Sequence, residues 1–188
     1  MPAARLEETM QALQQSIAFP DLLNPRELDH SDESDGWYTP VWMIDAARLV
    51  LGCIDTDPAT CAAAQAIVKA ATWYTATENG LVQPWHGRVW CNPPYSDPLP
   101  WAERMVALYQ GGTIEAGMML VNCSCSPKWA QHLWKHATAV CLLSRRINFW
   151  HPTKTNANGS YDRDSAVFYF GSKPALFSAV FERYGVIR

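Results

Sequence analysis

The residues with the clearest chemical signal are Asn92, Pro93, Pro94 and Tyr95, which follow the apolar stretch at 88–91. Each proline fixes its own φ at about −65°, removes a backbone N–H and pushes the preceding residue into an extended conformation. We therefore predict a stiff, non-helical loop directly after a strand, with carbonyl oxygens that no helix uses. Open α/β sheets bind ligands at this end of their strands, so the loop is the candidate catalytic site.

These groups suit chemistry on an aromatic amine such as the exocyclic amine of adenine. The lone pair of that nitrogen is delocalised into the ring, which makes the amine a poor nucleophile. Two acceptors that hold its two N–H bonds favour the pyramidal, nucleophilic form, and the Asn92 side-chain oxygen and the Pro93 carbonyl can supply them. Tyr95 offers a face for base stacking, which contributes about 1–3 kcal/mol. This set of groups suits methyl transfer to an amine.

The sequence Asn-Pro-Pro-Tyr after an apolar strand resembles the catalytic motif of the adenine-N6 and related amino methyltransferases. Residues 37–40, WYTP, resemble the element that packs over the cofactor in that superfamily. Residues 54–59, IDTDPA, resemble its first cofactor-binding strand and turn. Together with the later RRINFW and FYFG stretches, the ordered set resembles the small phage-type DNA N6-adenine methyltransferases over about residues 36–185.

This resemblance implies a Rossmann-like class I methyltransferase fold, S-adenosylmethionine as cofactor, and double-stranded DNA as partner, with one base flipped out. It makes Asn92, Pro93, Pro94 and Tyr95 the catalytic residues. It also implies that Asp55 and Asp57 accept hydrogen bonds from the cofactor, although Asp57 could instead be a plain helix cap. The implied cofactor-binding residues are Trp37, Tyr38, Thr39, Pro40, Asp55, Asp57, Pro58 and Ala59.

One departure concerns the turn after the first strand, which is glycine-rich in many such enzymes. This chain has no glycine between Gly52 and Gly80. We therefore expect the small residues Ala59 and Thr60 to let the backbone approach the cofactor, with N–H donors from a helix that begins after Pro58. The loop at 78–81 either contributes a contact to the site or is a simple Asn-Gly turn.

The distribution of charge suggests a phosphate-binding face in the second half of the chain. Residues 1–98 carry 5 basic and 13 acidic side chains, whereas residues 99–188 carry 10 and 5. A basic half of this kind can bind nucleic acid although the net charge is −3. The alternative is that scattered surface charges happen to fall this way. The candidate DNA contacts are Arg145, Arg146, Lys154 and Arg163, the last two in a polar loop at 151–164.

The chain divides into an N-terminal helix with an acidic linker, 1–35, and a methyltransferase domain, 36–188. Single helices separate most of the predicted strands, so we expect a mostly parallel sheet with helices on both faces and an antiparallel pair at one edge. Thr39, Thr60 and Ser126 are the expected helix caps. The expected strands are 52–56, 87–92, 116–122, 139–150 and 164–171, and the expected helices are 40–51, 60–71, 98–112, 126–137 and 174–185.

Other features narrow the compartment and the chemistry. No apolar run approaches the roughly 18 residues of a membrane span and the N-terminus lacks a secretory signal, so a cytoplasmic location is expected. The six cysteines are expected to be mostly buried free thiols. Cys123 and Cys125 lack a second pair at zinc-site spacing, so no metal site is expected. Two alternatives stay open, namely a methyltransferase for RNA adenine or a protein glutamine amide, and a catalytically silent DNA-binding module.

Overall fold

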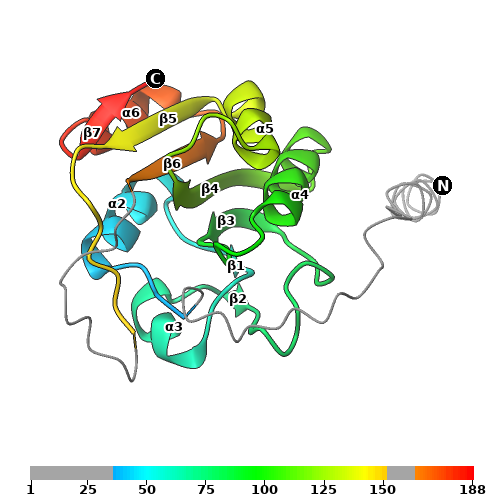
Figure 1. Ribbon diagram of the computed structural model, residues 1–188. Coiled ribbons are helices and arrows are strands. Elements are labelled where there is room, and N and C mark those ends of the chain that lie inside the picture. The colour runs from blue at the N-terminus through cyan, green and yellow to red at the C-terminus, as the bar shows by residue number, and fades with distance from the viewer. Residues whose placement is uncertain (1–35, 152–163) are drawn as a thin grey trace.

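A computed structural model describes residues 36–151 and 164–188, which form five helices and one seven-stranded sheet (Figure 1). The predicted N-terminal helix and linker at 1–35 lie outside the described residues, and so do Lys154 and Arg163. The helices are α2 (Val41–Leu51), α3 (Ala62–Val68), α4 (Leu99–Gln110), α5 (Lys128–His136) and α6 (Pro174–Phe181). The strands are β1 (Thr56–Asp57), β2 (Thr72–Trp73), β3 (Gly87–Cys91), β4 (Ile114–Asn122), β5 (Ala139–Leu143), β6 (Ser165–Phe170) and β7 (Gly185–Ile187).

The order of the strands across the sheet is β2-β1-β3-β4-β6-β5-β7. The first four run parallel to their neighbours, with α3 connecting β1 to β2 and α4 connecting β3 to β4. From β1 the chain first goes outward to β2 and then returns to place β3 on the other side. The strand order therefore reverses at β1, and such a reversal opens a crevice at the carboxyl ends of the two flanking strands.

Helices cover both faces of the sheet, as predicted (Figure 1). One face carries α2, α3 and α6 and the other carries α4 and α5. Successive side chains of a strand point to opposite faces, so β6 sends Val167 and Tyr169 to the first face and Ala166 and Phe168 to the second. Both sides of the central strands are therefore buried.

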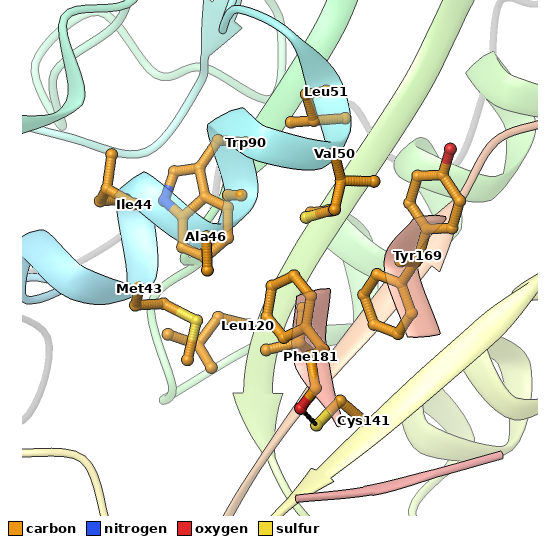
Figure 2. Close-up of a cluster of buried hydrophobic side chains, with 14 of the residues drawn as sticks. Met43, Ile44, Ala46, Val50, Leu51, Trp90, Leu120, Cys141, Tyr169 and Phe181 are labelled. Carbon is orange, nitrogen blue, oxygen red and sulfur yellow. Dashed lines mark hydrogen bonds between the residues drawn. The ribbon is translucent and has the colours of Figure 1, made fainter. Parts of the chain in front are cut away.

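The core on the α2 side is built around aromatic and branched side chains from both helices and strands. Figure 2 shows Met43 and Val50 of α2 facing Leu120 of β4, Tyr169 of β6 and Phe181 of α6. Phe177 of the same helix stacks on Tyr169 with ring centroids 5.2 Å apart. This packing fixes α2, and with it the segment at 37–40 that leads into the helix.

The predicted sheet is wrong in two respects. Three of its six strand pairings are parallel and three are antiparallel, so the sheet is mixed rather than mostly parallel. The predicted antiparallel pair, β5 and β6, exists but does not form the edge, because β6 is inserted beside β4 and β7 pairs with the outer side of β5. Strand β7 was not predicted, because its three residues are too few to show an alternation of polar and apolar side chains.

The three predicted caps are also wrong. Prolines take two of the N-cap positions, Pro40 before α2 and Pro127 before α5, and neither helix has a side-chain cap hydrogen bond. The third helix, α3, begins after Cys61, one residue later than a cap at Thr60 requires. It also ends earlier than predicted, because Lys69 adopts a left-handed conformation with φ of 49°.

Candidate active site

A pocket of about 510 Å³, counting the space open to solvent, lies where the strand order reverses. The chain enters it directly after β1, at Pro58, and directly after β3, at Asn92. The lining residues are Trp37, Tyr38, Pro58, Ala59, Thr60, Thr75, Ala76, Asn79, Gly80, Asn92, Pro94 and Trp101.

The pocket unites three stretches that are far apart in the sequence and that we singled out from it. These are the 37–40 segment, the turn after β1 and the loop after β3. Six of the twelve predicted catalytic and cofactor-binding residues are lining residues: Trp37, Tyr38, Pro58, Ala59, Asn92 and Pro94. The other six are not: Thr39, Pro40, Asp55, Asp57, Pro93 and Tyr95.

Asn92 is held in a defined orientation at the end of β3. Its Nδ2 donates a hydrogen bond to the Trp37 carbonyl oxygen over 3.3 Å. Its Oδ1 is buried, and none of the residues that the structure describes gives it a hydrogen-bond partner. Because the amide nitrogen is engaged, the acceptor end of the side chain is the end left for a ligand.

The segment that supplies the Trp37 carbonyl is itself fixed by a distant part of the chain. Tyr38 and Trp150 form an isolated antiparallel bridge, with Tyr38 N donating to Trp150 O over 2.7 Å and Trp150 N donating back over 3.0 Å. The Trp150 indole also donates to the Thr39 carbonyl over 3.1 Å. These bonds hold Trp37 and Tyr38 against the pocket.

Tyr95 lies beside the pocket and not in its wall. The ring packs against the core on the α2 side and meets Phe149 edge-on, with centroids 6.1 Å apart and planes at 86°. Phe149 belongs to the stretch after β5, and its side chain is 5% exposed. The Asn-Pro-Pro-Tyr loop therefore has two surroundings, the pocket at Asn92 and Pro94 and the aromatic side of the core at Tyr95.

Asp55 is engaged elsewhere. Its carboxylate accepts hydrogen bonds from Arg88 Nε over 2.7 Å, from Arg88 N over 2.8 Å and from Cys53 Sγ over 3.2 Å. The bond from the Arg88 guanidinium is the main reason that the pKa of Asp55 falls to about 2. Asp55 precedes β1 and Arg88 is near the start of β3, so this ion pair belongs to the opposite end of these strands from the pocket. We do not include Asp55 in the proposed cofactor site.

Asp57 is buried beneath the turn that forms one wall of the pocket. It accepts hydrogen bonds from Gln65 Nε2 over 2.8 Å and from the Ala59 backbone N–H over 3.4 Å. Gln65 also donates to Thr60 Oγ1 over 3.1 Å. Burial raises the pKa of Asp57 to about 7, although the hydrogen bonds it accepts act in the opposite direction. In this arrangement Asp57 supports the turn at 58–60 from below.

Part of the pocket lining comes from a loop that sequence reasoning only partly identified. Thr75 and Ala76 were not predicted to be site residues. Asn79 and Gly80 belong to the loop at 78–81, for which the sequence allowed two interpretations, a contact with the site or a simple Asn-Gly turn. Glu78 fixes this loop by accepting bonds from Thr75 N and Thr75 Oγ1, each over 2.9 Å. The Asn79-Gly80 dipeptide was the sequence signal that indicated a turn here. Asn79 does adopt the positive φ, 52°, that such turns favour.

Gly80 has a specific reason to be glycine. A Cβ at this position would overlap the Pro58 carbonyl oxygen, so the loop and the turn after β1 touch through their backbones. This contact closes the pocket on the side of β2. The glycine that permits close backbone approach is therefore in the second loop and not in the turn after the first strand.

The two arginines predicted to contact DNA lie in the stretch that follows β5. Both are exposed, and Arg146 Nε lies 3.9 Å from Asp164 Oδ1. Because β5 and β4 are both antiparallel to β6, they run in the same direction and end at the same edge of the sheet. Arg145 and Arg146 are therefore at the edge where the pocket opens.

The cysteines are less buried than expected. Cys91 and Cys141 are buried, whereas Cys53, Cys123 and Cys125 are exposed, and all six are free thiols. Over the described ranges, no group of three His, Cys, Asp or Glu side chains is placed to hold a metal ion. None of the described helices is long and apolar enough to cross a membrane.

Comparison with known proteins identifies the family. The family model described as DNA N-6-adenine-methyltransferase (Dam) matches residues 28–180. A curated relative named DNA N-6-adenine-methyltransferase, from Haemophilus phage HP1, is 32% identical over 121 residues, which are 62% of this chain and 67% of the relative. No solved structure matches. This chain belongs to the DNA N-6-adenine-methyltransferase family, and the predicted resemblance to phage-type enzymes is confirmed.

Proposed function

We propose that this protein is a site-specific DNA methyltransferase that transfers a methyl group from S-adenosylmethionine to the N6 amine of adenine. The observation that carries the proposal is the state of Asn92. Its Nδ2 is bonded to the Trp37 carbonyl and its buried Oδ1 has no partner among the described residues. A fixed acceptor of this kind, followed by the backbone carbonyl of Pro93, suits the two N–H bonds of an aromatic amine.

The pocket at the reversal of strand order fits the cofactor. It has aromatic walls at Trp37 and Tyr38, which suit an adenine ring, and a small residue at Ala59, which lets the backbone approach a ligand. Bound there, S-adenosylmethionine supplies an electrophilic methyl group. The role of the chain is to orient this ligand beside Asn92, which lines the same pocket.

The strand arrangement supports a Rossmann-like class I methyltransferase fold. Four neighbouring parallel strands reverse their order at β1, and the antiparallel β6 is inserted between β4 and β5. In open sheets of this type ligands bind at the carboxyl ends of the strands where the order reverses, which is where the pocket lies.

In the proposed mechanism the target adenine leaves the duplex, at a cost of a few kcal/mol, and enters beside the loop after β3. Tyr95 stacks on the base while Asn92 Oδ1 and the Pro93 carbonyl accept hydrogen bonds from its amine. These bonds strengthen as the nitrogen becomes tetrahedral, so they stabilise the transition state more than the ground state. Double-stranded DNA approaches the same edge of the sheet, where Arg145 and Arg146 are exposed.

The test is methyl transfer from labelled S-adenosylmethionine to duplex DNA, RNA and a glutamine-containing peptide, measured side by side. We expect labelled N6-methyladenine in the duplex DNA. Label in RNA or in the peptide alone would replace this proposal with one of the other two amine-bearing substrates. If the cofactor does not bind by calorimetry and no substrate is labelled, the chain is a silent DNA-binding module.

A further inference from the structure

Two buried polar side chains lie on the same face of the sheet where β4 ends and β6 begins. Asn122 is the last residue of β4, Ser165 is the first residue of β6, and the two are register partners in the antiparallel ladder. Directly opposed residues on such strands lie on the same face with Cβ atoms about 4.5–5.5 Å apart. Asn122 is 8% exposed and Ser165 is 1% exposed.

Each of these side chains has a buried oxygen that is unpaired within residues 36–151 and 164–188. Asn122 Oδ1 and Ser165 Oγ both lack a hydrogen-bond partner among the described residues. Buried side-chain polar atoms are nearly always hydrogen-bonded, because leaving them unpaired costs the full loss of their hydration. Two such atoms side by side at the end of a strand therefore suggest that a ligand completes them.

The position of this pair relative to Asn92 follows from the register. Cys91 of β3 is the partner of Met119 of β4, so one further step places Asn92 beside Leu120. Asn122 is two residues beyond Leu120 and therefore points to the same face. Adjacent strands are about 4.8 Å apart and rise about 3.3 Å per residue, which separates the Cα atoms of Asn92 and Asn122 by about 8 Å.

The same face carries the aromatic side of the candidate active site. Leu120 and Tyr169, which share the faces of Asn122 and Ser165 on their strands, belong to the core shown in Figure 2. Tyr95 packs against that core, in edge-on contact with Phe149. The unpaired Asn122 and Ser165 thus lie at the same end and on the same face of the sheet as the residues proposed to hold the base.

We propose that Asn122 and Ser165 read the ring edge of the flipped adenine by donating hydrogen bonds to a ring nitrogen that flanks the amine. This inference rests on the proposed function. The Ser165 hydroxyl can donate directly, and a half-turn of the Asn122 amide exchanges its acceptor for a donor. Asn92 accepts from the amine while this pair donates to N1 or N7 of the same ring.

The arrangement selects against bases that carry a carbonyl in place of the amine. An acceptor for the amine beside a donor for N1 matches adenine, and it matches cytosine through its amine and N3, whereas guanine and thymine present a carbonyl beside a ring N–H. Those bases would leave the acceptor opposed to an oxygen and the donors opposed to a hydrogen. A site built to hydrogen-bond its substrate rejects analogues that leave its buried groups unpaired.

The test uses the variants Ser165→Ala and Asn122→Leu, with Ser126→Ala as the matched control because Ser126 is exposed. Removal of an unpaired buried oxygen should leave the melting temperature unchanged or raise it. We expect kcat/KM for the target duplex to fall at least about tenfold in both variants and to stay unchanged in the control. A variant that melts well below the wild type and loses activity in proportion to unfolded protein would overturn the inference, because the residue would then be structural.

A second arm asks which atom of the base is read. The target adenine of a synthetic duplex is replaced by 7-deazaadenine or 1-deazaadenine, each of which lacks one ring nitrogen beside the amine. We expect the wild type to lose at least about tenfold in kcat/KM on one analogue, and Ser165→Ala to lose no more on that analogue than on adenine. If wild type and variant show equal sensitivity to both analogues, the inference is overturned while the proposed function stands. If the wild type methylates no duplex at all, the proposed function fails and this inference falls with it.

Discussion

Asn92 and Trp37 are joined by a hydrogen bond from the asparagine Nδ2 to the tryptophan carbonyl oxygen, over 3.3 Å. The two residues are 55 positions apart in the chain, and the bond fixes which end of the Asn92 amide faces the ligand. The backbone of the 37–40 segment is held by Trp150 in turn. The orientation of the proposed catalytic acceptor therefore depends on segments before α2 and after β5.

Tyr95 provides a test of stacking against hydrogen bonding. Replacement by alanine removes the aromatic face and should raise KM for the target duplex about tenfold or more, since base–aromatic stacking contributes about 1–3 kcal/mol. Tyr95→Phe keeps the face and the contact with Phe149, so it should retain most of the activity. Steady-state kinetics of the two variants measures the difference. A loss as large in Tyr95→Phe as in Tyr95→Ala would show that the hydroxyl, and not the ring, is needed.

Gly80→Ala should damage the cofactor pocket without touching the catalytic loop. The added Cβ meets the Pro58 carbonyl, so the loop and the turn after β1 must separate. We expect S-adenosylmethionine affinity, measured by calorimetry, to fall at least about tenfold, in keeping with the loss of a close backbone contact. Gly111→Ala is the control, because Gly111 has an ordinary φ of −75° at the end of α4. Equal affinities in both variants and the wild type would place the cofactor elsewhere.

Asp57 should make stability depend on pH. Burial raises its folded-state pKa to about 7 from an ordinary value of 3.8. The folded protein therefore binds the proton more tightly than the unfolded chain. The free energy of unfolding gains its full contribution from this group below about pH 4 and loses it as the pH rises to about 7.

The measurement is the difference in melting temperature between the wild type and Asp57→Asn across pH 4–8. Asparagine does not titrate, so the variant should gain relative to the wild type as the pH rises from about 4 to about 7, and the difference should then level off. A difference that stays constant over this range would show that Asp57 is ionised in the folded protein. The same variant tests whether the turn at 58–60 needs only an acceptor beneath it, because the asparagine side chain keeps one.

The predictions from sequence succeeded where a short motif fixes its own backbone. The prolines of 92–95 and the apolar run before them placed a rigid loop after a buried strand, and the structure has this loop at the carboxyl end of β3. The helices on both faces followed from the alternation of predicted strands with single helices. The matching set of 37–40, 54–59 and 92–95 identified most of the segments that meet at the pocket.

Other features depend on contacts that no local pattern contains. Asp55 has the sequence context of a cofactor ligand, yet its partner is Arg88, 33 residues away. Thr75 and Ala76 line the pocket on a loop whose Gly80 contacts the backbone of Pro58. The short strands β2 and β7 pair through the backbone of two and three residues and carry no periodic signal. Tertiary contacts, and not propensity, decide these positions.

The edge of the sheet beyond the pocket should bind phosphate. If the exposed Arg145 and Arg146 contact the duplex, the logarithm of the binding constant should fall linearly with log salt concentration. The slope should be about −0.9 for each neutralised phosphate. The double variant Arg145→Ala, Arg146→Ala should flatten that slope by up to about 1.8. Lys173→Ala serves as a control, because Lys173 precedes α6 and is also exposed. A wild-type affinity that does not change with salt would contradict a phosphate-binding face.

The most direct test of the whole account is the activity of Asn92→Ala. The substitution removes the acceptor that polarises the amine, and this interaction strengthens in the transition state, so the loss should appear mainly in kcat. Removal of one preorganised hydrogen-bonding group from an active site costs on the order of 10²–10³ in rate, and we expect a fall of that size with S-adenosylmethionine affinity nearly unchanged. If Asn92→Ala folds normally and methylates adenine at close to the wild-type rate, the loop after β3 is not the active site.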